Sequence, residues 1–205
     1  MGDCLLLTSP IRALKEEFPD FRVTVLVESR FAGCFEGNPD VDEVLSITRK
    51  KQAFGLVRRR FDLVLNLHGG PTSLTYGLLA RGPQVGFEQF QYRKLYRGLL
   101  PPPDPKVHSV EATMAAFQWL GVKRQTPPPL RFESQPGRLK QMLDSLRGPY
   151  AVIHPAALME TKRWEARRFA ELARSLQDFG LASVLTCGPG EESSVAAVAR
   201  DLRSP

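Results

Sequence analysis

Residues 150–186 read YAVIHPAALMETKRWEARRFAELARSLQDFGLASVLT, and this stretch decides the fold class. Tyr150–His154 and Leu181–Thr186 are short apolar runs bounded by glycine and proline, a pattern typical of buried strands. Between the two runs, apolar residues recur at the spacing of one helix face, at Phe169, Leu172, Ala173, Leu176 and Phe179. A strand, a helix and a strand in this order predict a βαβ unit and a parallel sheet, the hallmark of α/β proteins.

The same alternation runs through the preceding residues. It predicts strands at Arg22–Glu28, Glu43–Ile47, Phe61–Leu67 and Gln84–Phe87, with Phe61–Leu67 the clearest central strand. It predicts helices after the cap and first-turn pair Ser9-Pro10, at Ser73–Leu79, from Val110 to Leu120 and at Arg138–Leu146. Gly148-Pro149 breaks the last helix, so we expect a Rossmann-like domain over residues 1–147 and part of a second over 148–205.

Composition and charge limit the function classes. Hydrophobic residues make up 42% and charged residues 24%, which argues against disorder, and no apolar run approaches the roughly 18 residues of a membrane span. The three cysteines are far apart and the three histidines scattered, which predicts neither a disulfide framework nor a metal site and is typical of a cytosolic protein. The net charge of +6 favours an anionic partner, and nucleic acid, phosphorylated sugars and an acidic membrane surface all fit it.

Three segments carry side chains suited to chemistry. Gly2-Asp3 precedes the first predicted helix, where Asp3 is either a helix cap or a carboxylate aimed into a cleft as a general base. Thr161 and Lys162 follow a predicted strand, where a lysine either meets a phosphate or is simply solvated. Glu191 and Glu192 follow the turn after the next strand, where they either cap a helix or bind ribose hydroxyls.

Two further observations concern anion binding. Basic side chains gather in two places and fit either an acidic ligand or a solvated surface: Arg58, Arg60, Arg93, Lys94 and Arg97. The sequence contains neither the GxGxxG pattern of dinucleotide sites nor the GxxxxGK[ST] pattern of P-loops, which makes an NAD-dependent oxidoreductase a poor fit.

Five segments in this order together resemble glycosyltransferase family 9, the ADP-heptose:lipopolysaccharide heptosyltransferases. They are GDCLLLTSP at residues 2–10, GNPDVD at 37–42, DLVLNLHGG at 62–70, HP at 154–155 continued by KRW at 162–164 and FAEL at 169–172, and LTCGPGE at 185–191. The resemblance covers almost the whole chain and implies a GT-B fold, in which two Rossmann-like domains face a cleft.

The resemblance also implies an activity. Heptose would pass from an ADP-sugar to the lipopolysaccharide inner core by an inverting, metal-independent transfer without a further cofactor. Asp3 would deprotonate the acceptor hydroxyl, Lys162 beside Thr161 would neutralise the departing diphosphate, and Glu192 or Glu191 would hold the ribose. The expected partners are the nucleotide-sugar and an acidic lipid-linked saccharide, with no nucleic acid. The expected location is cytoplasmic, with peripheral contact to the inner membrane.

The sequence departs from the family pattern at several points. The family's first strand would precede Gly2, its DTGxxH segment would follow Pro205, and the glycine and serine of its HPGAS segment are Ala156 and Leu158 here. We therefore expect an incomplete piece of a transferase. The alternative is a non-catalytic remnant that binds nucleotides or other anions, and other nucleotide-sugars remain open as donors.

These departures predict that the 205-residue chain alone has little or no transferase activity. The measurement is turnover of ADP-heptose by the purified chain in the presence of an inner-core acceptor. Appreciable product formation would contradict the expectation.

Overall fold

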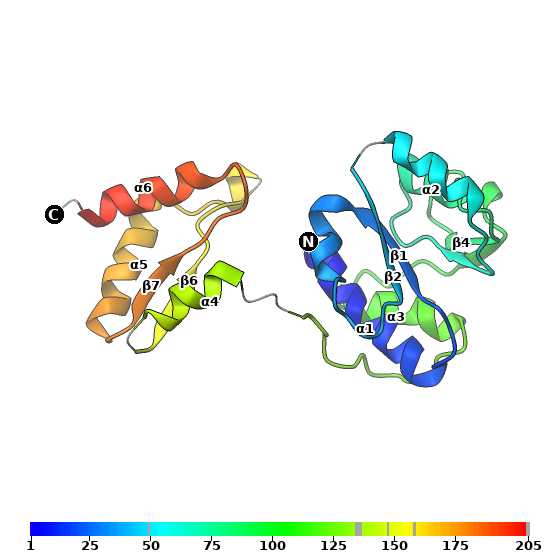
Figure 1. The fold of residues 1–205 in the computed structure, drawn as a ribbon, viewed down its shortest axis with the longest axis horizontal. Helices are drawn as coiled ribbons and strands as arrows, with labels where there is room; N and C mark the ends of the chain where they lie inside the picture. The colour runs from blue at the N-terminus through cyan, green and yellow to red at the C-terminus, as the bar shows by residue number, and fades with distance from the viewer. Residues whose placement is uncertain (49, 134–136, 147, 158, 204–205) are drawn as a thin grey trace. The chain divides into compact units, whose positions relative to one another are not determined.

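The computed structural model describes residues 1–48, 50–133, 137–146, 148–157 and 159–203. The chain forms two compact α/β units, Met1–Ser134 and Gln135–Pro205 (Figure 1). The sequence placed the boundary after residue 147, whereas in the structure helix α4 (Gly137–Asp144) belongs to the second unit. The proline-rich stretch at residues 127–129 therefore lies closer to the observed boundary than Gly148-Pro149 does.

The first unit alternates strands with helices, as predicted. Its elements are α1 (Gly2–Glu17), β1 (Thr24–Glu28), η1 (Ser29–Cys34), β2 (Glu43–Ile47), η2 (Lys50–Arg58), β3 (Val64–Leu65), α2 (Pro71–Leu79), β4 (Gln84–Phe87), η3 (Arg93–Leu95), β5 (Gly98–Leu100) and α3 (Ser109–Trp119). All strand pairs are parallel, in the orders β1-β2 and β3-β4-β5. The short strand β5 was not predicted, because it contains a glycine and runs directly into prolines.

Helix α1 begins earlier than the sequence predicted. Ser9-Pro10 was expected to start the helix, but Pro10 lies inside α1, and Gly2 and Asp3 form its first turn instead of a tight turn before it. The residue before the helix is Met1, and the hydroxyl of Ser9 donates to the Pro128 carbonyl at 2.5 Å. Pro10 is tolerated because a proline removes only one backbone donor and its ring is buried with the core face of α1.

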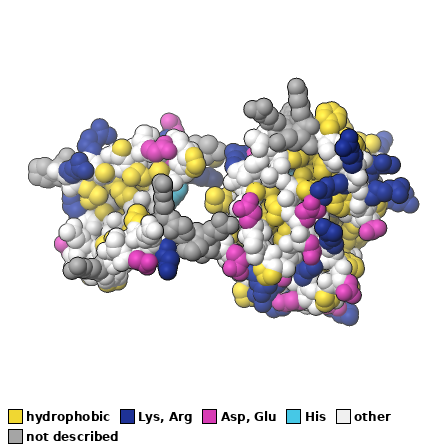
Figure 2. Space-filling view, viewed as in Figure 1, with side chains coloured by type: hydrophobic (Ala, Val, Ile, Leu, Met, Phe, Trp, Pro, Cys, Tyr) yellow, Lys and Arg dark blue, Asp and Glu magenta, His cyan; other side chains and the backbone are white. Residues whose placement is uncertain are grey.

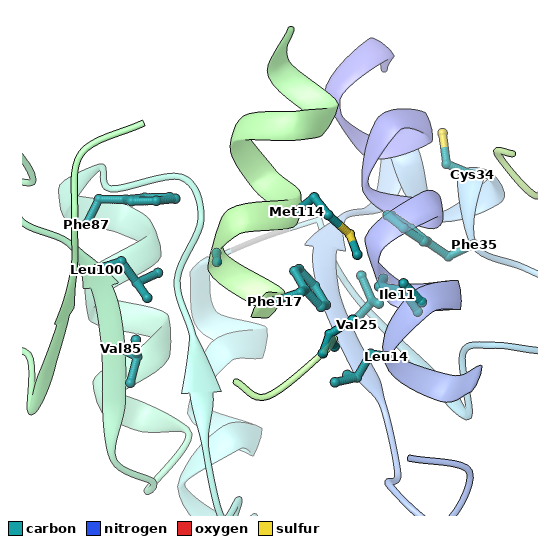
Figure 3. Packing of buried hydrophobic residues seen from close by; sticks show 13 residues of the cluster. Ile11, Leu14, Val25, Cys34, Phe35, Val85, Phe87, Leu100, Met114 and Phe117 are labelled. Atoms are coloured by element: carbon teal, nitrogen blue, oxygen red, sulfur yellow. The ribbon is translucent and has the colours of Figure 1, made fainter. Parts of the chain in front are cut away.

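One hydrophobic core joins both sheets of the first unit. Ile11 and Leu14 of α1 meet Val25 of β1, together with Met114 and Phe117 of α3 (Figure 3). The same cluster includes Val85, Phe87 and Leu100 from β4 and β5. Five segments distant in sequence therefore share one core, and burial of their apolar side chains is the main favourable contribution to the stability of this unit.

The predicted central strand Phe61–Leu67 is much shorter in the structure. Only Val64–Leu65 pairs, at the edge of the β3-β4-β5 sheet. The strand ends there because the Asn66 side chain accepts hydrogen bonds from the backbone N–H groups of His68 and Gly69, which turns the chain.

The second unit contains the predicted βαβ arrangement. Strands β6 (Tyr150–Ile153) and β7 (Ala182–Leu185) pair in parallel, and α5 (Ala166–Asp178) connects them. Helix α6 (Glu192–Arg203) follows β7 and packs against α5. Ala170, Ala173 and Val198, on the facing helices, are almost fully buried. The predicted apolar stripe of α5 is therefore only partly a core face: Ala173 is buried, whereas Leu172 and Phe179 are exposed, and Phe179 lies just after the end of the helix.

A strap, residues 127–133, lies on the first unit just before the boundary between the units. The backbone N–H of Arg131 donates to the Thr8 hydroxyl at 3.2 Å, and Pro128 accepts the hydrogen bond from Ser9. Thr8 and Ser9 are fully buried, so their hydroxyls need partners. The strap accepts the hydrogen bond of Ser9, while the Thr8 hydroxyl donates to the Leu5 carbonyl at 2.7 Å and accepts from the strap.

The turn at residues 37–42 holds the strap by charge. The Arg131 guanidinium contacts both carboxylate oxygens of Asp40 at 3.0 Å, and Asn38 donates to the Arg131 carbonyl at 3.2 Å. The Asp40 side chain is only 10% exposed, so Arg131 compensates a carboxylate that has lost most of its water.

We predict that Arg131→Gln and Asp40→Asn each lower the free energy of unfolding by about 1–2 kcal/mol, with a coupling of about 1 kcal/mol in a double-mutant cycle. Urea denaturation of the single and double variants measures both quantities. Arg30→Gln is the control, because its pair with Glu28 is well exposed and should contribute less than about 1 kcal/mol. Additive effects of the two substitutions would show that the pair does not hold the strap.

Candidate functional site

The carboxyl edge of the β6-β7 sheet gathers the candidate residues of the second unit. Ile153 pairs with Leu185 at the end of the two parallel strands, so the chain leaves both strands at the same level. His154 and Thr186, the next residues, meet with 3.2 Å between Nδ1 and Oγ1. Ligands of open α/β sheets bind in loops at this edge, so the segments that follow His154 and Thr186 form the candidate site.

A glycine turn after β7 positions the two acidic side chains. Gly190 has a φ of +85°, which favours glycine. The backbone N–H of Gly188 donates to Glu191 Oε2 at 3.0 Å, and that of Gly190 donates to Glu192 Oε1 at 3.1 Å. Glu191 Oε2 also lies 4.0 Å from His154 Nε2, so the turn joins both strand ends.

The two glutamates differ in how accessible their carboxylates are to a ligand. Glu191 is partly buried between the turn and His154, whereas Glu192 is exposed at the start of α6. Hydrogen bonds from its own backbone N–H and from Gly190 lower the pKa of Glu192, because they favour the charged form. At neutral pH Glu192 thus presents an accessible carboxylate, which suits it to accept hydrogen bonds from hydroxyl groups.

The loop after β6 carries two adjacent cations, Lys162, which is exposed, and Arg163, which is hydrogen-bonded to the loop backbone. Arg163 Nε donates to the Ala157 carbonyl at 2.6 Å, and this bond holds the loop closed on itself. Thr161 and Lys162 lie in the short helix η4 (Glu160–Lys162), and both are exposed. The Lys162 ammonium therefore stays accessible to an anionic ligand, while Arg163 stabilises the loop.

A cavity of about 250 Å³ lies between this loop and the helices that follow it, and the sequence did not predict it. Arg163 and Trp164 line it from the loop, and Phe169, Ser193 and Ser194 line it from α5 and α6. The Trp164 ring meets Phe169 edge to face at 5.2 Å, as expected for a tryptophan packed on the helix. The available signal in the sequence was Trp164, a large aromatic residue directly after Lys162 and Arg163, and half of its surface is exposed in the structure. Lys162, Glu191 and Glu192 do not line this cavity.

The candidates of the first unit lie on its surface. Asp3 is exposed in the first turn of α1. Among the residues that the structure describes, no hydrogen bond or ion pair joins Asp3 to a predicted acceptor-binding side chain.

The predicted basic groups are also exposed. They are Arg58 at the end of η2, Arg60 just after it, Arg93 and Lys94 in η3, and Arg97. Arg59, between the first two, is paired with Glu43 at 2.6 Å, a hydrogen bond that lowers the pKa of that carboxyl. Figure 2 shows Lys and Arg side chains gathered on the side of the first unit where Figure 1 places α2 and β4.

Within the described part of the chain, no three His, Cys, Asp or Glu side chains come together in a way that would hold a metal ion. No helix in the described ranges is long and apolar enough to cross a membrane.

We predict that Glu192 titrates below its usual value near 4.5 in the folded chain. A lowered folded pKa means that the carboxylate stabilises the fold above the unfolded pKa and loses this contribution as pH falls through the folded pKa. Glu192→Gln should therefore be less stable than the unaltered chain at pH 7, with a difference that shrinks as the pH falls below the unfolded value of 4.5. An NMR titration and melting curves at both pH values measure this. A midpoint at or above 4.5 would contradict it.

Comparison with known proteins identifies the family. The model of glycosyltransferase family 9 (heptosyltransferase) matches residues 49–204. Lipopolysaccharide heptosyltransferase 3 of Escherichia coli K12 is 26% identical over 93% of this chain and 61% of its own length. A second Escherichia coli protein of this name is 26% identical over the whole chain and 66% of its own length. The chain thus spans about two thirds or less of the curated relatives it matches.

Solved structures share the fold. A family 9 glycosyltransferase from Veillonella parvula superposes with a TM-score of 0.83, at 22% identity over 97% of this chain and 63% of its own. The Escherichia coli heptosyltransferase WaaC with ADP superposes with a TM-score of 0.74, at 21% identity over 98% of this chain and 70% of its own. These similarities confirm the predicted GT-B fold, and the match of the family model over most of the sequence shows that the chain belongs to glycosyltransferase family 9.

Proposed function

We propose that the protein containing this chain transfers a heptose from an ADP-sugar to the inner core of lipopolysaccharide, with inversion and without a metal ion or further cofactor. The observation that carries the proposal is the arrangement at the carboxyl edge of the β6-β7 sheet. An exposed ammonium, Lys162, follows one strand and an exposed carboxylate, Glu192, follows its neighbour. A nucleoside diphosphate offers the matching groups, an anionic diphosphate and ribose hydroxyls.

In this proposal the second unit binds the donor. Lys162, with the Thr161 hydroxyl beside it, neutralises the charge that develops on the diphosphate as the bond to the sugar breaks. Glu192 accepts hydrogen bonds from the ribose, while Glu191 stabilises the turn through Gly188. The names of the relatives support this assignment, since two are lipopolysaccharide heptosyltransferases and one solved structure contains ADP.

The first unit supplies the acceptor side. The acceptor hydroxyl oxygen attacks the anomeric carbon as the bond to the diphosphate oxygen breaks, so the sugar inverts and ADP leaves. Asp3 takes the proton of that hydroxyl, the role of a general base on the face opposite the leaving group. The basic side chains Arg58, Arg60, Arg93, Lys94 and Arg97 attract an acidic lipid-linked saccharide.

The same basic surface fits a protein that works beside a membrane. Lys and Arg side chains near an acidic lipid surface each contribute about 1 kcal/mol of attraction. We propose peripheral contact with the cytoplasmic face of the inner membrane, where the acceptor is anchored, and no nucleic-acid partner.

Donor binding can be tested on the chain itself. By isothermal titration calorimetry we expect ADP-heptose to bind more tightly than NAD. Lys162→Ala should weaken ADP-heptose binding about tenfold or more, because a charge-assisted contact to a phosphate contributes about 1.5–3 kcal/mol.

The matched control is Lys140→Ala, which removes an exposed lysine from α4 in the same unit and should leave binding unchanged. Equal affinity for NAD, or no effect of Lys162→Ala, would overturn the proposed donor site.

A further inference from the structure

Asn66 forms the centre of a buried polar contact in the first unit. It follows β3 and is only 6% exposed. Its Oδ1 accepts hydrogen bonds from the backbone N–H groups of His68 and Gly69, both at 3.1 Å, and its Nδ2 donates to the hydroxyl of Tyr96 at 3.0 Å. One side chain thus fixes the turn at its own strand end and reaches a residue thirty positions away along the sequence.

A second contact joins the same two segments. Gly69 has a φ of +73°, and a Cβ atom placed on it would lie 2.3 Å from the Phe90 ring. The ring therefore packs directly on the backbone of the turn, and only glycine leaves room for it. Phe90 also meets Phe87 of β4 edge to face at 5.4 Å, which anchors the ring to the sheet.

Tyr96, like Asn66, is buried and fixed by contacts with neighbouring segments. It is 7% exposed, and its ring lies so close to Gly86 of β4 that a Cβ atom there would be 2.5 Å away. The next residue, Arg97, donates its backbone N–H to the Gln84 carbonyl at 2.8 Å. Burial raises the pKa of Tyr96, so its hydroxyl is neutral at physiological pH and accepts a hydrogen bond from Asn66 Nδ2.

The segment before Tyr96 is built differently. Tyr92 takes a left-handed conformation, with a φ of 62°, at the start of the short helix η3. Arg93, Lys94 and Tyr92 are exposed, so the cations of this loop face solvent while its end is fixed to the core. Because the backbone at the end of this loop is held by the core, a ligand that binds the exposed cations orders little additional backbone. Binding then costs less conformational entropy.

We propose that Asn66 and Tyr96 are positioning residues that join the turn His68–Gly70 to the basic loop Tyr92–Arg97 in one ligand-binding platform. A saccharide that carries phosphate or carboxylate groups and binds Arg93 and Lys94 would then also order the turn at His68 and Gly69. This inference rests on the proposed function for the identity of the ligand, and on the hydrogen bonds of Asn66 for the coupling.

The coupling is tested with Tyr96→Phe in the full 205-residue chain, because this change removes only the hydroxyl. Without it the Asn66 amide loses a partner, and we expect the amides of His68 and Gly69 to exchange with solvent about five- to tenfold faster, as measured by NMR. Exchange at Val85 and Phe87 in β4 should not change. Tyr92→Phe is the matched control, because it removes an exposed hydroxyl from the same loop.

Unchanged exchange at His68 and Gly69 in Tyr96→Phe would overturn the inference. An equal increase throughout β4 would also overturn it, since the hydroxyl would then act on the stability of the whole unit.

The ligand is tested with a phosphorylated, lipid-free inner-core oligosaccharide of lipopolysaccharide. We expect it to slow exchange at His68 and Gly69 in the unaltered chain and in Tyr92→Phe, and to bind Tyr96→Phe about fivefold more weakly. The double substitution Arg93→Gln with Lys94→Gln should abolish binding, while Arg167→Gln with Arg168→Gln on α5 removes the same charge and should not. If the oligosaccharide does not bind but Tyr96→Phe still speeds exchange, the proposed acceptor is wrong and the coupling stands.

Discussion

Parallel pairing of strands is the constraint on which the rest of the structure depends. Strands that run the same way need a crossover connection, so the chain returns through a helix or a long loop after each strand. All carboxyl ends then lie at one edge of each sheet, and the loops that leave them become neighbours in space. In the second unit this brings together His154 and Thr186, which are distant in sequence but 3.2 Å apart. In the first unit it brings the turn after β3 next to the loop after β4, through Asn66 and Tyr96.

Charge is distributed on these loops in a consistent way. Side chains that hold the loops together are engaged with the backbone or with an opposite charge, as are Arg163 with Ala157, Arg59 with Glu43 and Arg131 with Asp40. Their neighbours Lys162, Arg58 and Arg60 remain exposed. In each adjacent pair of basic residues, one side chain therefore stabilises the loop and the other is exposed to solvent. A run of basic residues in a sequence does not show this division, because it depends on which carbonyl or carboxylate lies nearby.

The sequence predicted the elements whose signal is local. The strands β1, β2, β4, β6 and β7 and the helix α5 lie where expected, because a strand or helix that packs on a core needs a periodic apolar pattern. The predicted stripe of α5 was wrong at its end, since Phe179 is exposed just after the helix. The start of α1 was predicted wrongly, since Pro10 lies buried inside the helix and not in its first turn. The length of the strand at residues 61–67 was also wrong, because the Asn66 amide ends it.

The candidate site shows the same limit. Lys162 and Glu192 were found because they follow strands, and position after a strand can be read from the sequence. The pairing of Asn66 with Tyr96, the strap at residues 127–133 and the cavity beside Trp164 all require contacts between distant segments, which no local pattern encodes. An asparagine before His-Gly-Gly does signal a turn, but not the tyrosine that holds it.

We propose that the loops after β6 and β7 bind the nucleotide of the donor. The most direct measurement is an NMR titration of the isotopically labelled chain with ADP, following every assigned backbone amide. We expect the largest shift changes at residues 154–164 and 186–192, with small changes in the first unit. Saturable binding with its largest changes elsewhere, or no binding at millimolar ADP, would contradict it.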